Sequence, residues 1–565
     1  MPRSEHVAAF EWGEGMSQAH ASLAQVTEVR HTELSRTEER QVVLASTVGT
    51  LFEWYDFFIY GSLATFISAV LFPPNNPTAA LLASLAALAA GFVVRPIGAL
   101  LFGYLGDRFG RKVTFLATVV IMGSATVLMG CLPSYATAGN LSWILLLLLR
   151  LLQGLAVGGE YGGAVIYVSE HCARNRRGFL TSWIQLTGSA GLMLCLVVVL
   201  ITQGLMNPVD FKAWGWRVPF ILSVFLLGFS IYVRSKLHES PVFTRMKMER
   251  SLAANPVGEA FLHWPTLKIM LIALFGVTAG MGATYFTGQF YVMIFLQQAV
   301  LIDPVLVYKL VVIGFAIGAP AYILFGWLSD RIGRKWLMMA GLLLAALCYR
   351  PLFSQLMEAG NPALTAALRD RPVTVNALPS SDACTAGFAA ALVGSHPDNS
   401  KPCVRARKLL VSRGIDFTYG PPIANDDVAM SVNGITVEGF DPAGYAKALE
   451  AAGYPQKADP AHIDSVSIVS ILVLMTCLVA MIYGPVAAYL VELFPARVRY
   501  TSLSFPYHIG AGVIGGSLPF VATYLAVSGG QVLSGLWYPV LVTSIVGIVG
   551  TVVLPNRPGT SDSTR

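Results

Sequence analysis

Long apolar runs dominate this 565-residue sequence and leave it few possible folds. A membrane-spanning helix needs about 20 consecutive, mostly apolar residues. Only 12% of the residues are charged, against about 25% in soluble proteins. Because backbone polar groups inside a bilayer must be satisfied within the chain, we expect an all-α integral membrane protein. Twelve runs of spanning length predict its transmembrane helices: 44–71, 79–105, 112–132, 142–169, 178–204, 217–234, 266–298, 304–328, 335–357, 465–490, 500–526 and 534–555.

Basic residues between these runs predict the orientation of the chain. If the amino terminus lies inside, the inner loops carry 17 Lys and Arg residues, whereas the outer loops and outer helix ends carry about four. Cytoplasmic loops are enriched in Lys and Arg. We therefore expect a multi-pass protein of the plasma (inner) membrane with both termini in the cytoplasm.

The chain is a duplicated unit with one insertion. GYLGDRFGRK at 103–112 recurs as GWLSDRIGRK at 326–335, an offset of 223 residues between the aspartates. Glu170 with Arg177 recurs as Glu492 with Arg499 at an offset of 322, and the extra 99 residues nearly match one polar stretch. Doubled bundles are typical of alternating-access transporters. The predicted parts are a cytoplasmic tail 1–43, a six-helix bundle 44–234, a cytoplasmic connector 235–265, helices seven to nine at 266–357, an extracytoplasmic insertion 358–464, helices ten to twelve at 465–555, and a cytoplasmic tail 556–565.

Several motifs, in order, resemble one transporter family. The repeated GxLxDRxGRK is similar to the signature of the major facilitator superfamily. FEWYDFFIYG, FVVRPIGALLFG, RLLQGLAVGGEYGGA and VELFPARVRYTSLSFPYHIG resemble its metabolite:proton symporter family. That family includes carriers of shikimate, 2-oxoglutarate, citrate, and proline or betaine. The resemblance covers about 44–357 and 465–555, and it implies the twelve-helix major facilitator fold and transport rather than catalysis.

Charged residues inside the apolar runs are the candidates for proton coupling, because charge in a bilayer is costly and usually functional. Asp56 lies near the midplane of the first run and shares a helix face with Glu53 and Tyr60. In the fourth run Arg150, Gln153 and Glu160 share a face. An Asp56–Arg150 pair would be broken by protonation, which biases one conformation; the alternative is a fixed structural ion pair. The predicted proton-coupling residues are Asp56, Glu53, Arg150 and Glu160.

Arg95 is the leading candidate for binding a substrate carboxylate, which a guanidinium can hold through two parallel hydrogen bonds. It could instead pair with Glu53 or Asp56. Arg217 could assist an anion or anchor the helix at the interface beside Trp214 and Trp216. His508 could titrate near neutral pH or be a satisfied buried residue, and the polar residues of the seventh run could be helix contacts. The predicted substrate-binding residues are Arg95, Tyr60, Gln153, Arg217, Gln289, Tyr285, His508 and Tyr507.

Charged residues at the predicted inner helix ends form a separate group. The family resemblance implies that they build networks closing the cytoplasmic side in the outward-facing state, and their repetition in both halves favours this gate over a solvated loop. The predicted gate residues are Asp107, Arg108, Arg111, Glu170, Arg177, Asp330, Arg331, Arg334, Glu492 and Arg499.

The insertion reads as a small α/β cap. Cys384 and Cys403 are its only cysteines, and an extracytoplasmic location permits a disulfide between them. CVRARKLLVSRG and AGYAKALEAAG predict helices, and VAMSVNGITVEGF predicts a hairpin around Asn433-Gly434. KPCVRARKLLVSRGIDF is similar to a glutaredoxin helix and strand, but without CxxC we expect no redox role.

These observations predict a secondary transporter that imports a small organic anion together with a proton. The alternatives are proton-coupled uptake of a zwitterion such as proline or betaine, and a non-transporting membrane sensor. No CxxC, HExxH or GxxxxGK[ST] motif occurs, so we expect no enzyme activity, cofactor or metal. The expected partners are the organic anion, protons and the lipid bilayer, without nucleic acid, and we expect a monomer.

Overall fold

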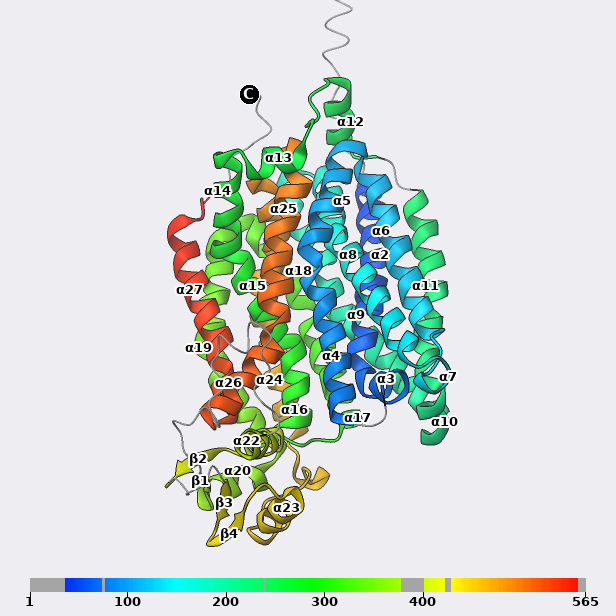
Figure 1. The fold of residues 1–565 in the computed structure, drawn as a ribbon. Coiled ribbons are helices and arrows are strands. Elements are labelled where there is room, and N and C mark those ends of the chain that lie inside the picture. The colour runs from blue at the N-terminus through cyan, green and yellow to red at the C-terminus, as the bar shows by residue number, and fades with distance from the viewer. Residues whose placement is uncertain (1–35, 74–76, 237–238, 377–400, 422–427, 557–565) are drawn as a thin grey trace, which may run out of the picture.

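A computed structural model describes residues 36–73, 77–236, 239–376, 401–421 and 428–556. Within these residues, twelve helices are long and apolar enough to cross a membrane, and each overlaps one predicted run. They stand side by side as one bundle (Figure 1). The sequence prediction of a twelve-helix membrane protein is confirmed.

The first half contains spans one to six. The amino-terminal helix begins at Arg36, so the part of the predicted tail from 36 to 43 extends span one; residues 1–35 lie outside the described residues. The elements of this half are α2 (Arg36–Ser62) with α3 (Ala64–Leu71), α4 (Pro77–Val93) with α5 (Arg95–Phe109), α6 (Arg111–Gly130), α8 (Asn140–His171), α9 (Arg177–Leu205) and α11 (Val218–Ser235), with short helices α7 (Tyr135–Ala138) and α10 (Pro208–Ala213) between spans.

The second half repeats this plan, and prolines interrupt equivalent spans. Pro96 follows the break between α4 and α5, and Pro320 opens the second helix of span eight, since proline cannot donate the helical hydrogen bond. Spans seven and eleven instead contain π-helical turns, which are frequent at functional sites. Span seven consists of α14 (Trp264–Ala273), η3 (Leu274–Thr278), α15 (Ala279–Tyr285), η4 (Phe286–Tyr291) and α16 (Val292–Gln298). Spans eight, nine and ten are α17 (Pro304–Gly318) with α18 (Pro320–Ile332), α19 (Arg334–Gly360) and α24 (Ser465–Leu493). Span eleven consists of α25 (Arg499–His508), η7 (Ile509–Gly515) and α26 (Leu518–Gly529), and span twelve is α27 (Trp537–Val553).

The two ends of the bundle differ. The connector helices α12 (Pro241–Met248) and α13 (Pro256–Phe261) lie at one end, and the strands of the insertion lie at the other (Figure 1). We call these the connector end and the insertion end.

Glycines bring α8 against α5 at backbone distance. Gly154 and Gly158 are spaced by four, and a Cβ at Gly158 would overlap the Arg95 carbonyl oxygen. Small residues at such spacing let two membrane helices approach closely. This contact holds the backbone of Arg95 against span four, so it positions the candidate site.

The insertion is a small α/β unit with its own apolar core. Strand β1 (Val373–Asn376) pairs in parallel with β2 (Phe417–Gly420), and α22 (Pro402–Ser412) connects them; β3 (Ala429–Val432) and β4 (Ile435–Glu438) add antiparallel strands in the order β2-β1-β3-β4. The Asn433-Gly434 turn has positive φ at both residues, 47° and 80°, as predicted for this hairpin. The last helix is α23 (Pro442–Ala451). Cys403 is disulfide-bonded, and Cys384 lies outside the described residues.

Polar contacts fasten the insertion to the second half. The buried Arg407 guanidinium donates two hydrogen bonds, of 3.0 and 2.7 Å, to the Val527 carbonyl oxygen at the end of α26. Asp416 accepts a 2.7 Å hydrogen bond from the Val532 amide, and the Ala458 amide donates to the Leu301 carbonyl oxygen at 3.0 Å. The insertion therefore rests on the loops that follow spans seven and eleven.

The Gly158 contact predicts opposite effects for two glycine-to-alanine substitutions. Gly158→Ala forces α8 away from α5, so we expect a loss of about 1–3 kcal/mol in stability and a lower apparent melting temperature in detergent. Gly228→Ala on α11 is the control, because nothing lies within 4 Å of its Cβ position and alanine favours a helix by about 0.5–1 kcal/mol. Equal melting temperatures for the two variants would contradict the close contact.

Candidate functional site

Two buried arginines lie on one aromatic ring near the middle of the bundle. The guanidinium carbon of Arg95 lies 4.2 Å from the Phe57 ring centroid, and that of Arg150 lies 5.3 Å from the same centroid. Both side chains are 1% exposed, and Nε and Nη2 of each have no hydrogen-bond partner in the described part of the chain. Within the same residues no ion pair joins either arginine to a carboxylate. These unpaired N–H groups are candidates for binding an anion.

The predicted direct pair between Asp56 and Arg150 is wrong, because Gln153 stands between them. The Gln153 side-chain oxygen accepts from Arg150, and its Nε2 donates to the Asp56 main-chain carbonyl oxygen at 3.1 Å and to Thr126 at 2.9 Å. The Asp56 carboxylate instead accepts a 2.6 Å hydrogen bond from Ser223 of α11. Asp56 is therefore buried, and its carboxylate accepts a hydrogen bond from a neutral hydroxyl and not from a cation.

Arg234 joins Glu53 and Glu160, the two other carboxylates among the predicted proton-coupling residues. This residue is one of the 17 basic residues counted at the inner side and is the last residue of the predicted run 217–234; it lies in the last turn of α11 and is 1% exposed. Its Nη2 forms an ion pair with Oε1 of Glu53 and another, at 3.1 Å, with Oε1 of Glu160. Its guanidinium carbon lies 3.7 Å from the centroid of the Phe115 ring. One cation therefore serves two glutamates contributed by spans one and four.

Aromatic and polar side chains from both halves surround the arginines. Tyr161 of α8 stacks on Tyr507 of α25 with ring centroids 3.5 Å apart, and the buried His508 lies beside Tyr507 at 5.1 Å. Tyr285 lies 6.0 Å from Trp54 between ring centroids, across the two halves. The structure thus brings residues of spans one, four, seven and eleven together, as expected for a site between the halves.

Other predicted binding residues have structural partners. Gln289 accepts from Ser189 of α9 at 2.9 Å and donates to Thr476 at 3.3 Å, so it bridges the halves. The Tyr60 hydroxyl donates to the Ser84 carbonyl oxygen at 2.9 Å, and its ring lies 4.1 Å from the guanidinium carbon of Arg150.

Arg217 does not join the site. It lies at the insertion end, donates to the Leu132 carbonyl oxygen at 3.1 Å and lies over the Trp216 ring at 4.4 Å. The interfacial-anchor alternative fits this position, because Trp and Arg are typical of membrane–water interfaces.

At the connector end, Asp107 caps a helix of the opposite half. Its carboxylate accepts from the Tyr500 amide at 3.2 Å and from the Thr501 amide and hydroxyl at 2.9 Å each, at the beginning of α25. Arg111 forms an ion pair of 2.6 Å with the same carboxylate and donates a hydrogen bond to the Ala496 carbonyl oxygen at 3.1 Å. A carboxylate at a helix amino terminus satisfies amides that otherwise lack partners.

Asp330 repeats this arrangement in the other direction. It accepts from the Gly178 amide at 2.9 Å and the Phe179 amide at 2.8 Å, at the beginning of α9. Arg334 holds Asp330 at 2.9 Å and Glu492 at 2.6 Å. Each half therefore caps a helix of its counterpart with the aspartate of its repeated motif.

Ion pairs between the halves complete this closure. Glu170 binds Arg499 at 2.9 Å, and Glu492 lies 3.8 Å from Arg177. Arg108 and Arg331, also predicted here, are exposed and lie over Tyr104 and Trp327 of their own helices, at 5.6 and 3.9 Å. Eight of the ten predicted gate residues are thus brought together.

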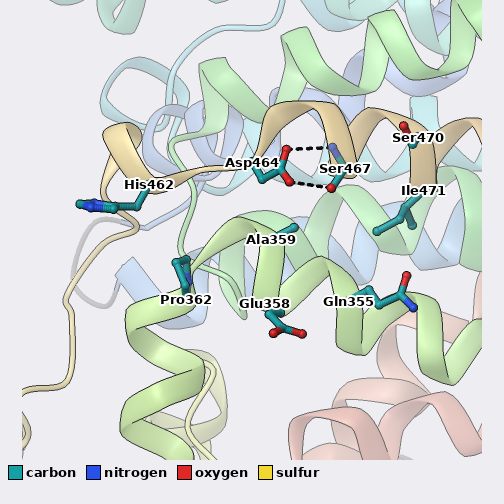
Figure 2. Close-up of a pocket in the computed structure, with 9 residues that line it drawn as sticks. All are labelled: Gln355, Glu358, Ala359, Pro362, His462, Asp464, Ser467, Ser470 and Ile471. Carbon is teal, nitrogen blue, oxygen red and sulfur yellow. Dashed lines mark hydrogen bonds between the residues drawn. The ribbon is translucent and has the colours of Figure 1, made fainter.

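An open cavity of about 590 Å³ lies elsewhere, at the insertion end between α19 and α24. Figure 2 shows Glu358 and Gln355 on one side and Asp464 opposite, with two hydrogen bonds from Ser467 to Asp464. The hydrogen bond from the Ser467 hydroxyl, followed by the bond from the Ser467 amide, lowers the pKa of Asp464. Asp464 caps α24, so its carboxylate has a structural role and the cavity is separate from the buried arginines.

Sequence reasoning missed Arg234, Ser223 and the amides that cap the two aspartates. The amides carry no side-chain signal. Arg234 could have been found, because a continuous apolar run from Pro219 to Val233 places it within the last turn of span six.

Comparisons with known proteins agree with this architecture. Residues 42–260 match the family model "Sugar (and other) transporter". The chain is 36% identical over 335 residues to the inner membrane metabolite transport protein YhjE of Escherichia coli, covering 58% of this chain and 75% of that protein. It is 34% identical to the E. coli shikimate transporter, with coverage of 57% and 74%. It is 35% identical to the glycine betaine/proline/ectoine/pipecolic acid transporter OusA of Dickeya dadantii, with coverage of 54% and 62%.

The fold also matches a solved transporter. The proton:xylose symporter XylE bound to 6-bromo-6-deoxy-D-glucose aligns with a TM-score of 0.58 at 15% identity, covering 93% of this chain and 98% of that one. This likeness concerns the fold. Together with the relatives, it shows that the chain belongs to the metabolite:proton symporter family of the major facilitator superfamily.

Proposed function

We propose that this protein imports a small organic anion, a mono- or dicarboxylate or a shikimate-like acid, together with a proton. The observation that carries this proposal is the pair of buried guanidiniums, Arg95 and Arg150, whose Nε and Nη2 groups lack hydrogen-bond partners in the described residues, while another nitrogen of Arg150 donates to Gln153. Two unpaired cations inside a bilayer are costly unless an anion joins them. A carboxylate fits, because a guanidinium binds it through two charge-assisted hydrogen bonds.

Asp56 is the proposed proton carrier of this site. When it is ionised, its negative charge opposes the entry of an anion beside Phe57, and its bound hydroxyl from Ser223 provides no compensating charge. When it is protonated, the two guanidiniums act without that opposition. Proton and anion therefore favour each other's binding, which is the thermodynamic requirement for symport.

Relatives support an organic acid and also keep a second candidate open. The similar proteins include a shikimate transporter and an alpha-ketoglutarate permease of E. coli, as well as proline/betaine transporters. The aromatic rings around the site favour a quaternary ammonium such as betaine through cation–π contacts. The two arginines argue against it, since they would repel an ammonium group.

The connector end is the proposed cytoplasmic side, so the insertion lies outside. Basic residues cluster at the connector end, as cytoplasmic loops require. The closures by Asp107 and Asp330 then form a cytoplasmic gate that is shut in this structure. Opening the gate requires both aspartates to leave the helix ends that they cap.

Removing one guanidinium tests the anion site. We expect Arg95→Gln to raise the KM for the transported acid about 10- to 100-fold, because a charge-assisted hydrogen bond contributes about 1.5–3 kcal/mol. The measurement is uptake into proteoliposomes of shikimate, 2-oxoglutarate, citrate, a monocarboxylate, proline and betaine. Arg217→Gln, outside the site, is the matched control. Uptake of betaine or proline alone, unaffected by Arg95→Gln, would contradict the proposal.

Neutralising Asp56 tests the proton role. We expect Asp56→Asn to retain exchange of acid across the membrane but to lose accumulation driven by an inward proton gradient. In the unmodified protein, acid affinity should rise as pH falls, and in Asp56→Asn it should be independent of pH. Counterflow and gradient-driven uptake of labelled acid measure the two activities. Gradient-driven accumulation that survives in Asp56→Asn would exclude Asp56 as the carrier.

Loosening one cap tests the gate. Asp107→Asn removes the charge that caps α25, so we expect about 1–2 kcal/mol less stability for the closed gate and about 5- to 30-fold more of the open form. The reporter is Ser329→Cys, a buried position of α18 at this end, alkylated by a membrane-impermeant maleimide. Arg331→Gln is the control, because Arg331 is exposed and lies on α18 together with the Ser329→Cys reporter. An unchanged alkylation rate in Asp107→Asn would show that Asp107 does not hold the gate.

A further inference from the structure

The cluster of Glu53, Arg234 and Glu160 has more negative than positive charge. Both glutamates approach the same nitrogen of Arg234, and Glu53 Oε2 has no hydrogen-bond partner in the described part of the chain. The exposed fractions are 7% for Glu53, 3% for Glu160 and 1% for Arg234. With both glutamates ionised, this buried cluster holds one uncompensated negative charge. One proton on the two carboxylates removes that charge.

The cluster lies directly beneath the closed connector end. Tyr500, whose amide is capped by Asp107, donates its hydroxyl to the Gly159 carbonyl oxygen at 2.5 Å. Gly159 precedes Glu160 in α8, and the Tyr500 ring lies against Gly106. Tyr500 belongs to the second half, so separating the halves at this end removes the ring that covers the first-half cluster.

Other ionisable side chains lie near the cluster. The Arg234 guanidinium also packs against the backbone at Gly49 and the ring of Phe115. The ionisable side chains around the cluster on the elements packed against it are Asp56 on α2, Asp107 on α5, Arg111 on α6, Tyr167 on α8, Cys195 on α9 and Tyr500 on α25.

We propose that Glu53 and Glu160, held by Arg234, form a second proton-binding site, separate from Asp56, which binds a proton while the cytoplasmic gate is closed and releases it to the cytoplasm when the gate opens. This inference rests on the proposed function for the direction of transport. In the closed form the proton sits on one carboxylate, and the other pairs with Arg234. When Tyr500 withdraws, water solvates the cluster, and the proton passes to water and leaves two ionised glutamates.

This arrangement couples pH to the gate with a defined sign. The closed form binds one proton more than the open form, so a rise in pH favours opening by up to about tenfold per pH unit. Glu53→Gln or Glu160→Gln makes the cluster permanently neutral, which mimics the protonated state. Either variant should keep the gate closed at every pH.

The test requires no substrate and uses Ser329→Cys in the full-length protein in proteoliposomes. At each pH from 6 to 9, the rate of alkylation by the impermeant maleimide is divided by the rate in the same protein carrying Glu53→Gln. This ratio cancels the pH dependence of the thiol chemistry. Glu160→Gln gives an independent second reference, and size-exclusion profiles verify that both variants fold.

We expect the ratio to rise at least tenfold from pH 6 to 9 with either reference, and the rise to persist in Asp56→Asn. A ratio that stays constant with pH for both references would overturn the second proton site. A rise that disappears in Asp56→Asn would assign the proton to Asp56 and also overturn the proposal. Because no transported solute is involved, these outcomes are independent of whether the protein carries an organic anion.

Discussion

The cost of placing charge in a bilayer governs this structure, because every buried arginine must be stabilised within the protein. Arg111 is held by Asp107 and the Ala496 carbonyl, with Glu170 at 3.9 Å, and this arrangement helps to lock the connector end. Arg234 lies between two glutamates, where the charge count depends on one proton. Arg95 has aromatic rings but no carboxylate within the described residues. In the proposed mechanism these three arrangements are a lock, a proton site and an anion site.

Much of the fold was predictable because its signals are local in the sequence. Apolar length located the spans, the repeated motif revealed the two halves, and Asn433-Gly434 identified the hairpin. The gate was partly predictable, since its aspartates and arginines recur at fixed spacing. Their partners were not predictable, because Asp330 binds amides of Gly178 and Phe179 that have no side-chain signal.

The site was less predictable than the fold for a geometrical reason. Helical periodicity gives the face on which a residue lies, but not which neighbouring helix meets that face. Asp56 and Arg150 lie on facing helices as expected, yet Gln153 fills the space between them and Ser223 of span six takes the carboxylate. Arg234 ends the predicted run 217–234, but nothing local in the sequence shows that Glu53 and Glu160 of two other spans meet it there.

The insertion makes the two halves unequal. Its contacts through Arg407, Asp416 and Ala458 reach loops of the second half, so we expect it to move with that half. Its parallel β1–β2 pair, joined through α22, agrees with the similarity of 401–417 to a glutaredoxin helix and strand.

In the proposed mechanism, buried arginines bind an organic anion whose transport is coupled to protons. One proton carried with a monocarboxylate moves no net charge, so the most direct test follows labelled substrate and internal pH together in proteoliposomes, with the same panel of acids, proline and betaine applied at several proton gradients. We expect uptake of an organic acid that is accompanied by proton entry and that grows with the inward proton gradient. Uptake of betaine or proline alone, or acid uptake indifferent to the proton gradient, would contradict the proposal.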